Sequence, residues 1–451
     1  MMNYKALLRR LRVSVAFIAT LFAVSALATS QTESVIYNFP SVEQSQLTVC
    51  GPHGNLVADA AGNFYGTDAG CDPVPATVYE IVRPAPPSKQ WNRKVLYTFT
   101  GGATGGDPMT GLTFDNAGDL YGTANSGGAF GLGVVFQLIH PATPNGQWTE
   151  IVIHSFAGPP NDGSSPGQTG VVFDKSGNLY GATPLGGITI AENPLCGDGL
   201  YYATTSCGVV FQMTSPPTAG GEWGEAVIHY FDYTQGAFPV GTPIFDAQGN
   251  LYGATYGGGP HRGGSVYRLN HPVAATDPWK FRVLYTFPND FGTDMSYPAG
   301  SLTLHGTGEL YGNAGGGPHE GGVFQLVPPT VAGGPWTENV LHDFSSGGDG
   351  TYPNANLLVD KAGNLYGTTG SGGSGGSSPF CYQGCGTVFE LSPPASVGGT
   401  WTETILHSFP AGEYDGVKPS TGLIFSKDGS LVGVTHDGGK LGSGMVYKIT
   451  P

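Results

Sequence analysis

Short apolar segments separated by turn residues recur along the chain in sets of four. In the set that ends near residue 409 they cover residues 356–359, 365–368, 387–391 and 405–409. Short runs rich in β-branched and aromatic residues, bounded by Gly, Pro and Asp, are typical of strands. Beyond the first 28 residues, no segment keeps the 3.6-residue apolar period of an amphipathic helix. The pattern predicts an almost entirely β protein.

The second segment of each set carries the motif G-N-L-Y-G-T-T or a variant of it. Seven copies follow one another at intervals of 55 to 72 residues, and they begin at Gly62, Gly118, Gly177, Gly249, Gly308, Gly363 and Gly429. This period predicts a solenoid, a propeller or an array. We expect the Tyr of the motif to fill the space between repeats, and the Gly after it to let a neighbouring backbone approach.

Two of the four connections in each repeat keep a constant length. The first-to-second turn is D-x-x-G, with Asp59, Asp115, Asp174, Asp246 and Asp360, and with His305 and Ser426 in the other two copies. Such a turn suits a tight hairpin. The third strand ends ten residues before a Trp in all six copies that have one: Trp91, Trp148, Trp223, Trp279, Trp336 and Trp401. In an antiparallel blade these two connections lie at one end, here called the constant face.

The other two connections vary in length and form the opposite end, here called the variable face. The second-to-third connection ranges from 11 to 29 residues, and the fourth-to-first connection usually contains Asp-Gly and a Pro seven residues before the turn. Loops of variable length on a rigid scaffold are where binding residues usually lie. We therefore expect function on the variable face.

The two ends of the chain predict a closed ring. The last copy has only three strands, 422–425, 431–434 and 445–449, whereas residues 35–39 near the N-terminus have the pattern of the fourth strand 95–99. If residues 34–39 pair with residues 445–449, the ring closes and no edge strand is left exposed. The sequence predicts an all-β, seven-bladed β-propeller of four-stranded antiparallel blades.

These motifs resemble a known family. The segments D-x-x-G-N-L-Y-G-T-T, the paired glycines and G-x-V-F-x-L are similar to the GloVer (Gloeobacter/Verrucomicrobia) tandem repeat of bacterial surface proteins, and the strand pattern is similar to NHL-type propeller repeats. The resemblance covers essentially all of residues 34–450. It implies a β-propeller and an exported protein, and it brings no established activity.

The N-terminus has the layout of a secretory signal peptide. Lys5, Arg9, Arg10 and Arg12 precede an apolar run, 13–28, that ends in Ala-Leu-Ala. We expect a signal peptide at 1–28 and a single mature domain at 29–451, exported to the periplasm, the cell surface or the medium. An uncleaved membrane anchor is the alternative, although the run is shorter than the roughly 20 residues that span a bilayer.

Charge and cysteine content narrow the class of partner. The chain has 18 Lys+Arg and 33 Asp+Glu, so without the four basic residues of the leader the charge is 14 − 33 = −19. This negative charge disfavours binding to nucleic acid or to anionic membranes. We expect a monomer whose partner is an extracellular glycan or protein. The six cysteines predict disulfides. Because blades are too far apart to be bridged, we expect Cys50–Cys71, Cys196–Cys207 and Cys381–Cys385, acting on the variable-face loops more than on the propeller.

Most candidate chemical groups have a structural interpretation. The six tryptophans occupy one repeat position, and His154, His229, His342 and His407 share a position with Tyr37, Tyr97 and Tyr285, so both sets are expected to pack. Asp162, Asp349 and Asp415 belong to Asp-Gly turns, for which calcium is the alternative. No cofactor is otherwise expected, and no nucleophile elbow, H-E-x-x-H or Walker motif is present.

Candidate ligand-binding residues on the variable face are His53, His261, Arg262, His319, Glu320, His436 and Asp437. The leading hypothesis is a non-catalytic propeller that binds a glycan, a peptide or an envelope partner there. The alternative is an extracellular lyase or hydrolase with a His/Asp site at the channel mouth, since imidazole titrates near neutrality. Two or more of the histidines and Asp437 lying within metal or proton-transfer reach would favour the enzyme.

Overall fold

The structure is a computed structural model. It describes residues 31–40, 51–70, 74–143, 146–167, 169–197, 206–218, 220–274, 276–289, 294–345, 348–353, 355–374, 376, 381, 384–396, 398–410, 415–419 and 421–450. The signal peptide predicted at 1–28 lies outside these residues, as do Cys50 and Cys71. No helix in the described part of the chain is long and apolar enough to cross a membrane.

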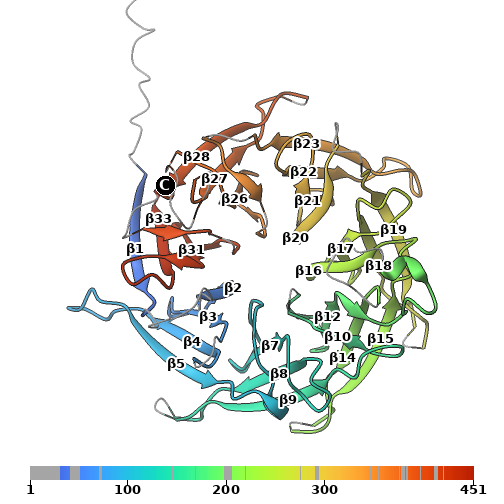
Figure 1. The fold of residues 1–451 in the computed structure, drawn as a ribbon, viewed down its shortest axis with the longest axis horizontal. Helices are drawn as coiled ribbons and strands as arrows, with labels where there is room; N and C mark the ends of the chain where they lie inside the picture. Colours follow the sequence, from blue (N-terminus) through green and yellow to red (C-terminus); the bar gives the residue numbers. More distant parts are fainter. Residues whose placement is uncertain are drawn as a thin grey trace, which may run out of the picture.

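Seven blades surround a central axis (Figure 1). The strands of each blade are given from the inner to the outer one. Blade one contains β2 (Pro52–Ala58), β3 (Phe64–Asp68), β4 (Thr77–Val82) and β5 (Asn92–Thr98), and blade two contains β6 (Thr113–Phe114), β7 (Leu120–Ala124), β8 (Val134–Ile139) and β9 (Thr149–Ser155). Blade three contains β11 (Val172–Phe173), β12 (Leu179–Thr183), β14 (Val209–Thr214) and β15 (Gly224–Tyr230). In blades four and five they are β16 (Ala237–Phe245), β17 (Leu251–Gly257), β18 (Ser265–Asn270) and β19 (Lys280–Thr286), and β20 (Ser296–His305), β21 (Glu309–Gly316), β22 (Gly322–Val327) and β23 (Thr337–Asp343).

Blade six begins with two short inner strands, β24 (Thr351–Pro353) and β25 (Leu358–Val359), followed by β26 (Leu365–Ser371), β27 (Thr387–Ser392) and β28 (Thr402–Ser408). Blade seven contains β30 (Ile424–Phe425), β31 (Leu431–Thr435) and β33 (Met445–Thr450), with β1 (Thr32–Asn38) from the N-terminus as its outer strand. β1 runs antiparallel to β33, with Val35 opposite Tyr447 and Asn38 opposite Met445. The predicted all-β propeller of seven blades and its closure by the N-terminal strand are confirmed.

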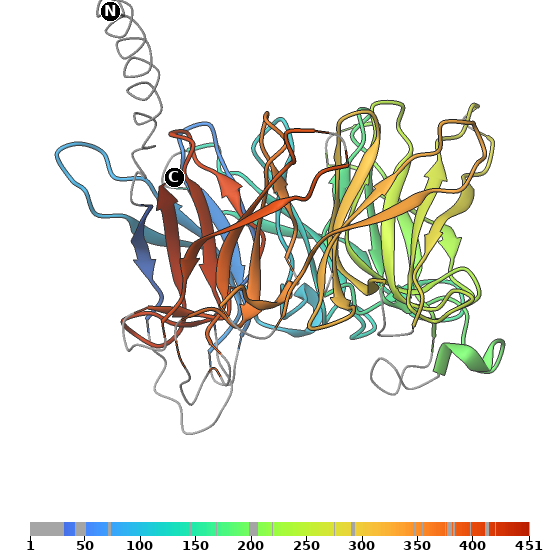
Figure 2. The ribbon, with the colours of Figure 1, turned by 90° about the horizontal axis from the view of Figure 1, so that it is seen from above.

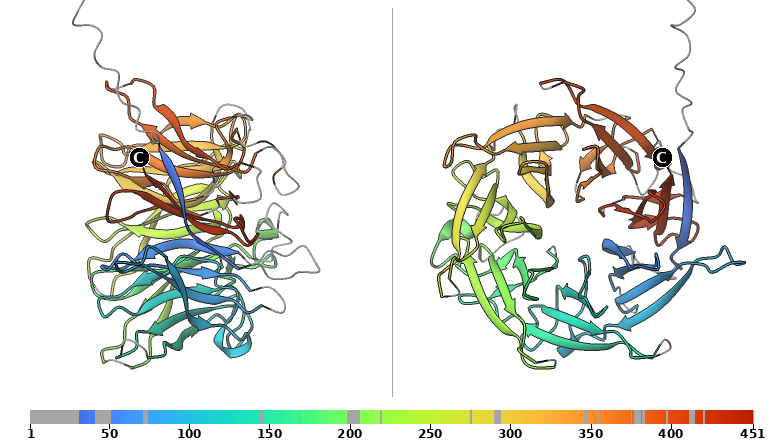
Figure 3. Two further views of the ribbon diagram at one scale, coloured as in Figure 1. Left: turned by 90° about the vertical axis from the view of Figure 1, so that its left-hand side faces the viewer. Right: turned by 180° about the vertical axis from the view of Figure 1, so that it is seen from behind.

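The two faces differ as the loop lengths predict. Short additional elements lie in the connections of the variable face: the strand pairs β10 (Gly163–Ser164) with β13 (Leu185–Gly186) and β29 (Gly416–Val417) with β32 (Asp437–Gly438), and the 3-10 turns η1 (Gly102–Thr104) and η2 (Pro194–Gly197). In Figure 2 the ring is seen from the side, and η2, in green, projects below the blades, while the hairpin turns lie on the upper rim. Figure 3 shows the same ring from two further directions.

The Asp of the D-x-x-G turn explains why the motif continues with Asn and Tyr. In blade six, Asp360 Oδ1 accepts the backbone N–H groups of Ala362 at 2.8 Å and Asn364 at 2.9 Å, and Oδ2 accepts Asn364 Nδ2 at 2.9 Å and the Tyr366 hydroxyl at 3.3 Å. Gly363 takes the left-handed φ of 88° that the turn requires. One carboxylate thus ties the hairpin to the strand that follows it.

The Gly after this Tyr makes room for a side chain, so the expectation of a close backbone is wrong. A Cβ on Gly367 would lie 2.4 Å from Cζ of Phe389 on the adjacent strand β27, and one on Gly253 would lie 2.3 Å from the Tyr267 hydroxyl. Phe389 is fully buried. The missing side chain therefore lets the large aromatic ring of the third strand lie across the second strand.

The tryptophans and the motif tyrosines pack against each other between blades. Trp223 contacts Tyr121 of the preceding blade with ring centroids 6.0 Å apart, and Trp279 contacts Tyr180 at 5.5 Å. Both rings lie edge to face, an arrangement that stabilises aromatic pairs. The structural interpretation of both residue positions agrees with these contacts.

Candidate functional site at the channel mouth

The inner strands of all seven blades converge on a cavity of about 350 Å³ on the ring axis. Its lining consists of small or uncharged residues and one histidine: His53, Gly54, Asn55, Met109, Thr110, Gly111, Gly167, Gly170, Gly241, Thr242, Gly300, Ser301, Ala355, Asn356 and Thr421. Convergence requires small residues. A Cβ on Gly241 would lie 2.4 Å from the carbonyl carbon of Gly300 in the next blade.

Side chains of the lining join each blade to the next. The backbone N–H of Thr242 donates to Ser301 Oγ at 2.7 Å, and the N–H of Ser301 donates to Asn356 Oδ1 at 2.7 Å. At the seam between blades seven and one, the N–H of Gly422 donates to Asn55 Oδ1 at 2.6 Å. Polar side chains of the cavity lining therefore join neighbouring blades by hydrogen bonds.

His53 stands at this seam beside His436. The two rings lie edge to face with centroids 4.4 Å apart. His53 Nδ1 is 2.9 Å from the Gly51 carbonyl, so it carries the proton and leaves Nε2 as the acceptor. His436 Nδ1 is 2.7 Å from Asp437 Oδ1, and Asp437 Oδ2 accepts a hydrogen bond from Lys418 Nζ at 3.1 Å. The structure thus brings together three of the candidate residues.

Burial determines the protonation of this cluster. Burial and, to a smaller extent, the neighbouring His436 lower the pKa of His53 to about 4, against the opposing effects of the Gly51 carbonyl, Asp437 and Asp107. Burial by itself would raise the pKa of Asp437, but hydrogen bonds and charge from His436 and Lys418 bring it below its ordinary value. At neutral pH His53 is therefore a neutral base next to an ionised aspartate.

The other candidate residues lie elsewhere. His261 and Arg262 are exposed on the loop of blade four, and Arg262 has a positive φ of 64°. His319 of blade five contacts Asp343 through Nδ1 at 2.5 Å, and its side chain is 59% exposed. Glu320 lies beside it and accepts the Tyr352 N–H through its backbone carbonyl. Blades four and five lie across the ring from the seam (Figure 1), so these residues do not join the His53 cluster.

Six non-glycine residues around the channel mouth have positive φ directly before a proline. We call them the pre-proline ring: Asp107, Ser165, Phe238, Tyr297, Tyr352 and Lys418, with φ between 54° and 59°. Ser165, Phe238, Tyr297, Tyr352 and Lys418 are each anchored by a backbone N–H that donates to a second-to-third loop carbonyl of the preceding blade, as in Lys418 N–H to the Cys385 carbonyl at 2.9 Å. This conformation is uncommon for residues with a Cβ. These residues were not among the candidates expected from the sequence, although each precedes a Pro in the fourth-to-first connection.

The pre-proline ring presents different side chains from blade to blade. Tyr352 is 52% exposed and the Lys418 side chain is 48% exposed, on the neighbouring blades six and seven. Phe238 is buried, and Tyr297 is covered by Tyr256 with ring centroids 5.2 Å apart. Tyr352 and Lys418 therefore offer the ring's most accessible aromatic and cationic groups, and Lys418 contacts Asp437 of the His53 cluster.

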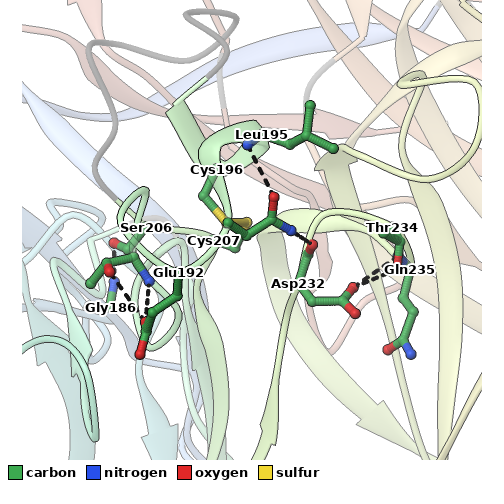
Figure 4. The surroundings of a disulfide bond; sticks show 11 residues. Gly186, Glu192, Leu195, Cys196, Ser206, Cys207, Asp232, Thr234 and Gln235 are labelled. Atoms are coloured by element: carbon green, nitrogen blue, oxygen red, sulfur yellow. Dashed lines mark hydrogen bonds between the residues drawn. A yellow bond between two sulfur atoms is a disulfide. The ribbon is translucent and has the colours of Figure 1, made fainter.

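Two of the predicted disulfides are present and both are buried. Cys196–Cys207 and Cys381–Cys385 join residues within single second-to-third connections, whereas the predicted Cys50–Cys71 bridge lies outside the described residues. Cys196 and Cys207 pack with Phe231, Tyr233 and Phe238. Figure 4 shows the surroundings of this bridge, including Asp232, whose carboxylate accepts hydrogen bonds from Thr234 and Gln235. Both bridges therefore lie within packed hydrophobic clusters beneath the variable-face loops.

Comparisons with known proteins give a family but no activity. No curated protein matches the chain. Among solved structures, a luciferin-regenerating enzyme is 12% identical with a TM-score of 0.44, covering 82% of this chain and 98% of its own. Drosophila Semaphorin 1a is 11% identical with a TM-score of 0.47, covering 91% and 87%. An ulvan lyase with bound saccharide is 11% identical with a TM-score of 0.45, covering 92% and 95%. These likenesses are too distant to carry an argument.

The family model for the Gloeobacter/Verrucomicrobia repeat matches residues 192–378 and 314–451, which together cover more than half of the sequence. The matched region includes the turn, L-Y-G and third-strand motifs of the later blades, and the same hydrogen bonds recur in the earlier ones. The chain belongs to the Gloeobacter/Verrucomicrobia repeat family.

Proposed function

We propose that the chain is an exported, non-catalytic binding scaffold whose variable face receives an uncharged, hydroxyl-rich ligand, for which a glycan is the favoured class. The pre-proline ring carries this proposal. Residues held in sparsely populated backbone conformations cost of the order of 1 to 3 kcal/mol each and cluster at ligand-binding sites. Here each of the six lies two or three residues before a residue that lines the cavity.

The cavity lining supports the ligand class. His53 is the one titratable side chain among its described lining residues, and the others offer hydroxyl, amide and backbone groups. Such groups match the donors and acceptors of sugar hydroxyls. The exposed ring of Tyr352 adds a flat apolar surface, and aromatic residues of this kind often dominate binding energy. The net charge of the chain, −15, further disfavours polyanions.

A glycan array followed by calorimetry on the best ligand tests the proposal. Tyr352→Ala and Met109→Trp, which fills the cavity mouth, should each weaken binding at least tenfold. The matched controls Val331→Ala and Val331→Trp change an exposed residue of the constant face and should bind as wild type. Binding that is unchanged in Tyr352→Ala and Met109→Trp, or confined to acidic polymers, would contradict the proposal.

A second candidate is a polysaccharide lyase or hydrolase. It is favoured by the proximity of His53, His436 and Asp437, in which neutral His53 Nε2 is available to accept a proton. Incubation with extracellular polysaccharides, followed by measurement of reducing ends and of absorbance from unsaturated products, tests it. Turnover that is abolished in His53→Ala and preserved in Val331→Ala would show that the protein is an enzyme and would contradict the proposal of a non-catalytic binding scaffold.

A further inference from the structure

The outer strands form a second ring of contacts, independent of the proposed binding site. At several interfaces, the His or Tyr that lies six residues after the Trp position meets the residue that lies two after the Trp position of the next blade. Tyr97 donates to Glu150 Oε2 at 2.8 Å, and Tyr285 donates to Glu338 Oε2 at 2.8 Å. His229 stacks on Phe281. These interfaces therefore have their own matched pairs.

Two consecutive interfaces gather three possible metal ligands each. Between blades five and six, His342 Nε2 lies 3.7 Å from Asp349 Oδ2 and 3.6 Å from Glu403 Oε1. Between blades six and seven, His407 Nε2 lies 3.4 Å from Asp415 Oδ2, and Glu33 completes the group. Within each cluster the three ligand atoms lie within 4.8 Å of one another.

Four of the six ligand atoms in these clusters lack a hydrogen bond within the described part of the chain, whereas Asp349 Oδ2 accepts hydrogen bonds from the backbone N–H and the hydroxyl of Ser345. His342 Nε2, Glu403 Oε1, His407 Nε2 and Glu33 Oε1 are all buried and have no hydrogen-bond partner among the described residues. Buried polar atoms in native proteins are nearly always satisfied, and a buried carboxylate without a partner is costly. Glu150, Glu225 and Glu338 also have an Oε1 without a partner at the equivalent position of other interfaces, so the feature specific to these two clusters is an unpartnered imidazole Nε2 that faces two carboxylates.

We propose that each cluster, His342–Asp349–Glu403 and His407–Asp415–Glu33, binds a divalent transition-metal ion of the zinc class. The separations of 3.4 to 3.7 Å are long for hydrogen bonds. They match two ligands that each lie about 2.0 to 2.2 Å from a tetrahedral zinc ion, which are roughly 3.3 to 3.6 Å apart. A water molecule would supply the fourth ligand.

The ligand set argues for zinc over calcium. Calcium takes six to eight oxygen ligands, whereas each cluster offers one imidazole nitrogen and two carboxylates, a mixture that suits zinc. Asp349 and Asp415 are two of the three Asp-Gly residues for which the sequence left calcium open. Their partners in the clusters are His342 and His407, for which the sequence predicts a packing role. The presence of an imidazole in each cluster favours zinc over calcium.

The interface between blades two and three shows what a closed cluster looks like. His154 Nε2 is 3.0 Å from Asp162 Oδ2, within hydrogen-bond distance. Asp162 also accepts the backbone N–H of Ala157 at 2.7 Å and that of Gly163 at 2.6 Å. His154 Nε2 is therefore partnered without an ion, although Glu225, the third residue at this interface, also has an Oε1 without a hydrogen-bond partner among the described residues. These three residues are not among the described groups whose ligand atoms all lie within 4.8 Å of one another, so His154 is a matched internal control.

The second metal site would also reinforce ring closure. Glu33 lies on β1, the strand that closes the ring, while His407 lies on β28 of blade six and Asp415 on the connection into blade seven. An ion at this site crosslinks the N-terminal strand to a blade other than the one that it completes. Metal binding would then stabilise the closed ring directly.

Zinc stoichiometry tests the proposal. The mature chain is stripped with EDTA, incubated with a small excess of zinc, desalted and analysed by mass spectrometry for bound metal. Wild type should retain two ions, His342→Tyr and His407→Tyr one each, and the double variant none. Tyr is chosen because it pairs with Glu in the same position at two other interfaces. His154→Tyr should retain two ions.

Melting temperatures provide a readout that does not depend on the tyrosine variants. Zinc should raise the melting temperature of wild type by several degrees, and Glu33→Gln should remove the part that depends on the second site. Wild type that retains no zinc, or an unchanged stoichiometry in the folded double variant, would overturn the proposal. Loss of zinc in His154→Tyr would overturn the assignment of ligands.

Discussion

His229 of blade three lies flat on Phe281 of blade four, with ring centroids 3.7 Å apart and planes within 3° of parallel. At the equivalent position three other blades also carry His, and their partners in the next blade are carboxylates. The imidazole of His229 thus packs against a hydrocarbon ring, and its Nε2 is buried without a hydrogen-bond partner among the described residues.

This contact predicts a loss of stability in acid. Burial lowers the pKa of His229 to about 4, against the opposing charge of Asp232, while the unfolded chain has a pKa of about 6.5. Between these values the unfolded state binds more protons, so the free energy of unfolding falls as pH drops from 6.5 to 4, by up to about 3 kcal/mol. In urea titrations at several pH values, His229→Phe should lose this component. His271→Phe, at an exposed position, should retain it.

The raised pKa of Glu150 predicts the opposite pH dependence of the free energy of unfolding. Burial raises its pKa to about 7, although the hydrogen bond from Tyr97 opposes the shift. The folded state then binds the extra proton between the unfolded value of about 4.3 and about 7, so this contribution to stability is present below the lower value and is lost as pH rises through 7. Glu150→Gln keeps an acceptor for Tyr97, so it should stabilise the protein at pH 8 and have no such effect at pH 4. Equal effects at both values would contradict the assignment.

The N-terminal strand should control the integrity of the ring. Phe39, which directly follows β1, is buried and contacts Tyr79 of blade one with ring centroids 5.1 Å apart, so residues 32–39 seal a blade interface as well as an edge. Their removal should lower the melting temperature by about 10 °C or more and promote association through the exposed edge of β33. Calorimetry and gel filtration measure both effects.

The control for this deletion is a chain that begins at residue 31 and keeps β1 intact. Adding a synthetic peptide of residues 31–40 to the shortened protein should restore part of the lost stability, because the register with β33 is set by residues within that segment. A shortened chain with the melting temperature of the control would show that β1 is dispensable.

The buried disulfide of blade three should stabilise the whole propeller. Replacing Cys196 and Cys207 with Ala should cost about 3 kcal/mol from the 11-residue separation, and the same change at Cys381 and Cys385, separated by 4 residues, should cost about 2 kcal/mol. Urea unfolding of both double variants, followed by tryptophan fluorescence, measures the difference. If only protease cleavage of the loop changes, the bridge acts locally.

The repeat itself made the architecture predictable from the sequence. Blade number, the position of each D-x-x-G turn and the incomplete last blade depend on short-range patterns that recur at constant spacing, and a strand missing at one end must be supplied by the other. The disulfides Cys196–Cys207 and Cys381–Cys385 were predictable because both partners lie in one connection. Their burial was not, since it depends on Phe231, Phe238 and other residues that the fold brings over the loop.

The tertiary structure alone decided what the interface residues do. His154, His229, His342 and His407 occupy one sequence position and share one expected role, yet one is hydrogen-bonded to Asp162, one is stacked on Phe281 and two face paired carboxylates. His229 meets Phe281 of the next blade, 52 residues further along the chain, and His407 lies beside Glu33 from the opposite terminus, whereas Asp162, Asp349 and Asp415 lie only seven or eight residues after their histidines. His53 and His436 likewise meet only because the ring closes. Local patterns specify strands and turns, but the chemistry of each pair depends on which blade packs beside it.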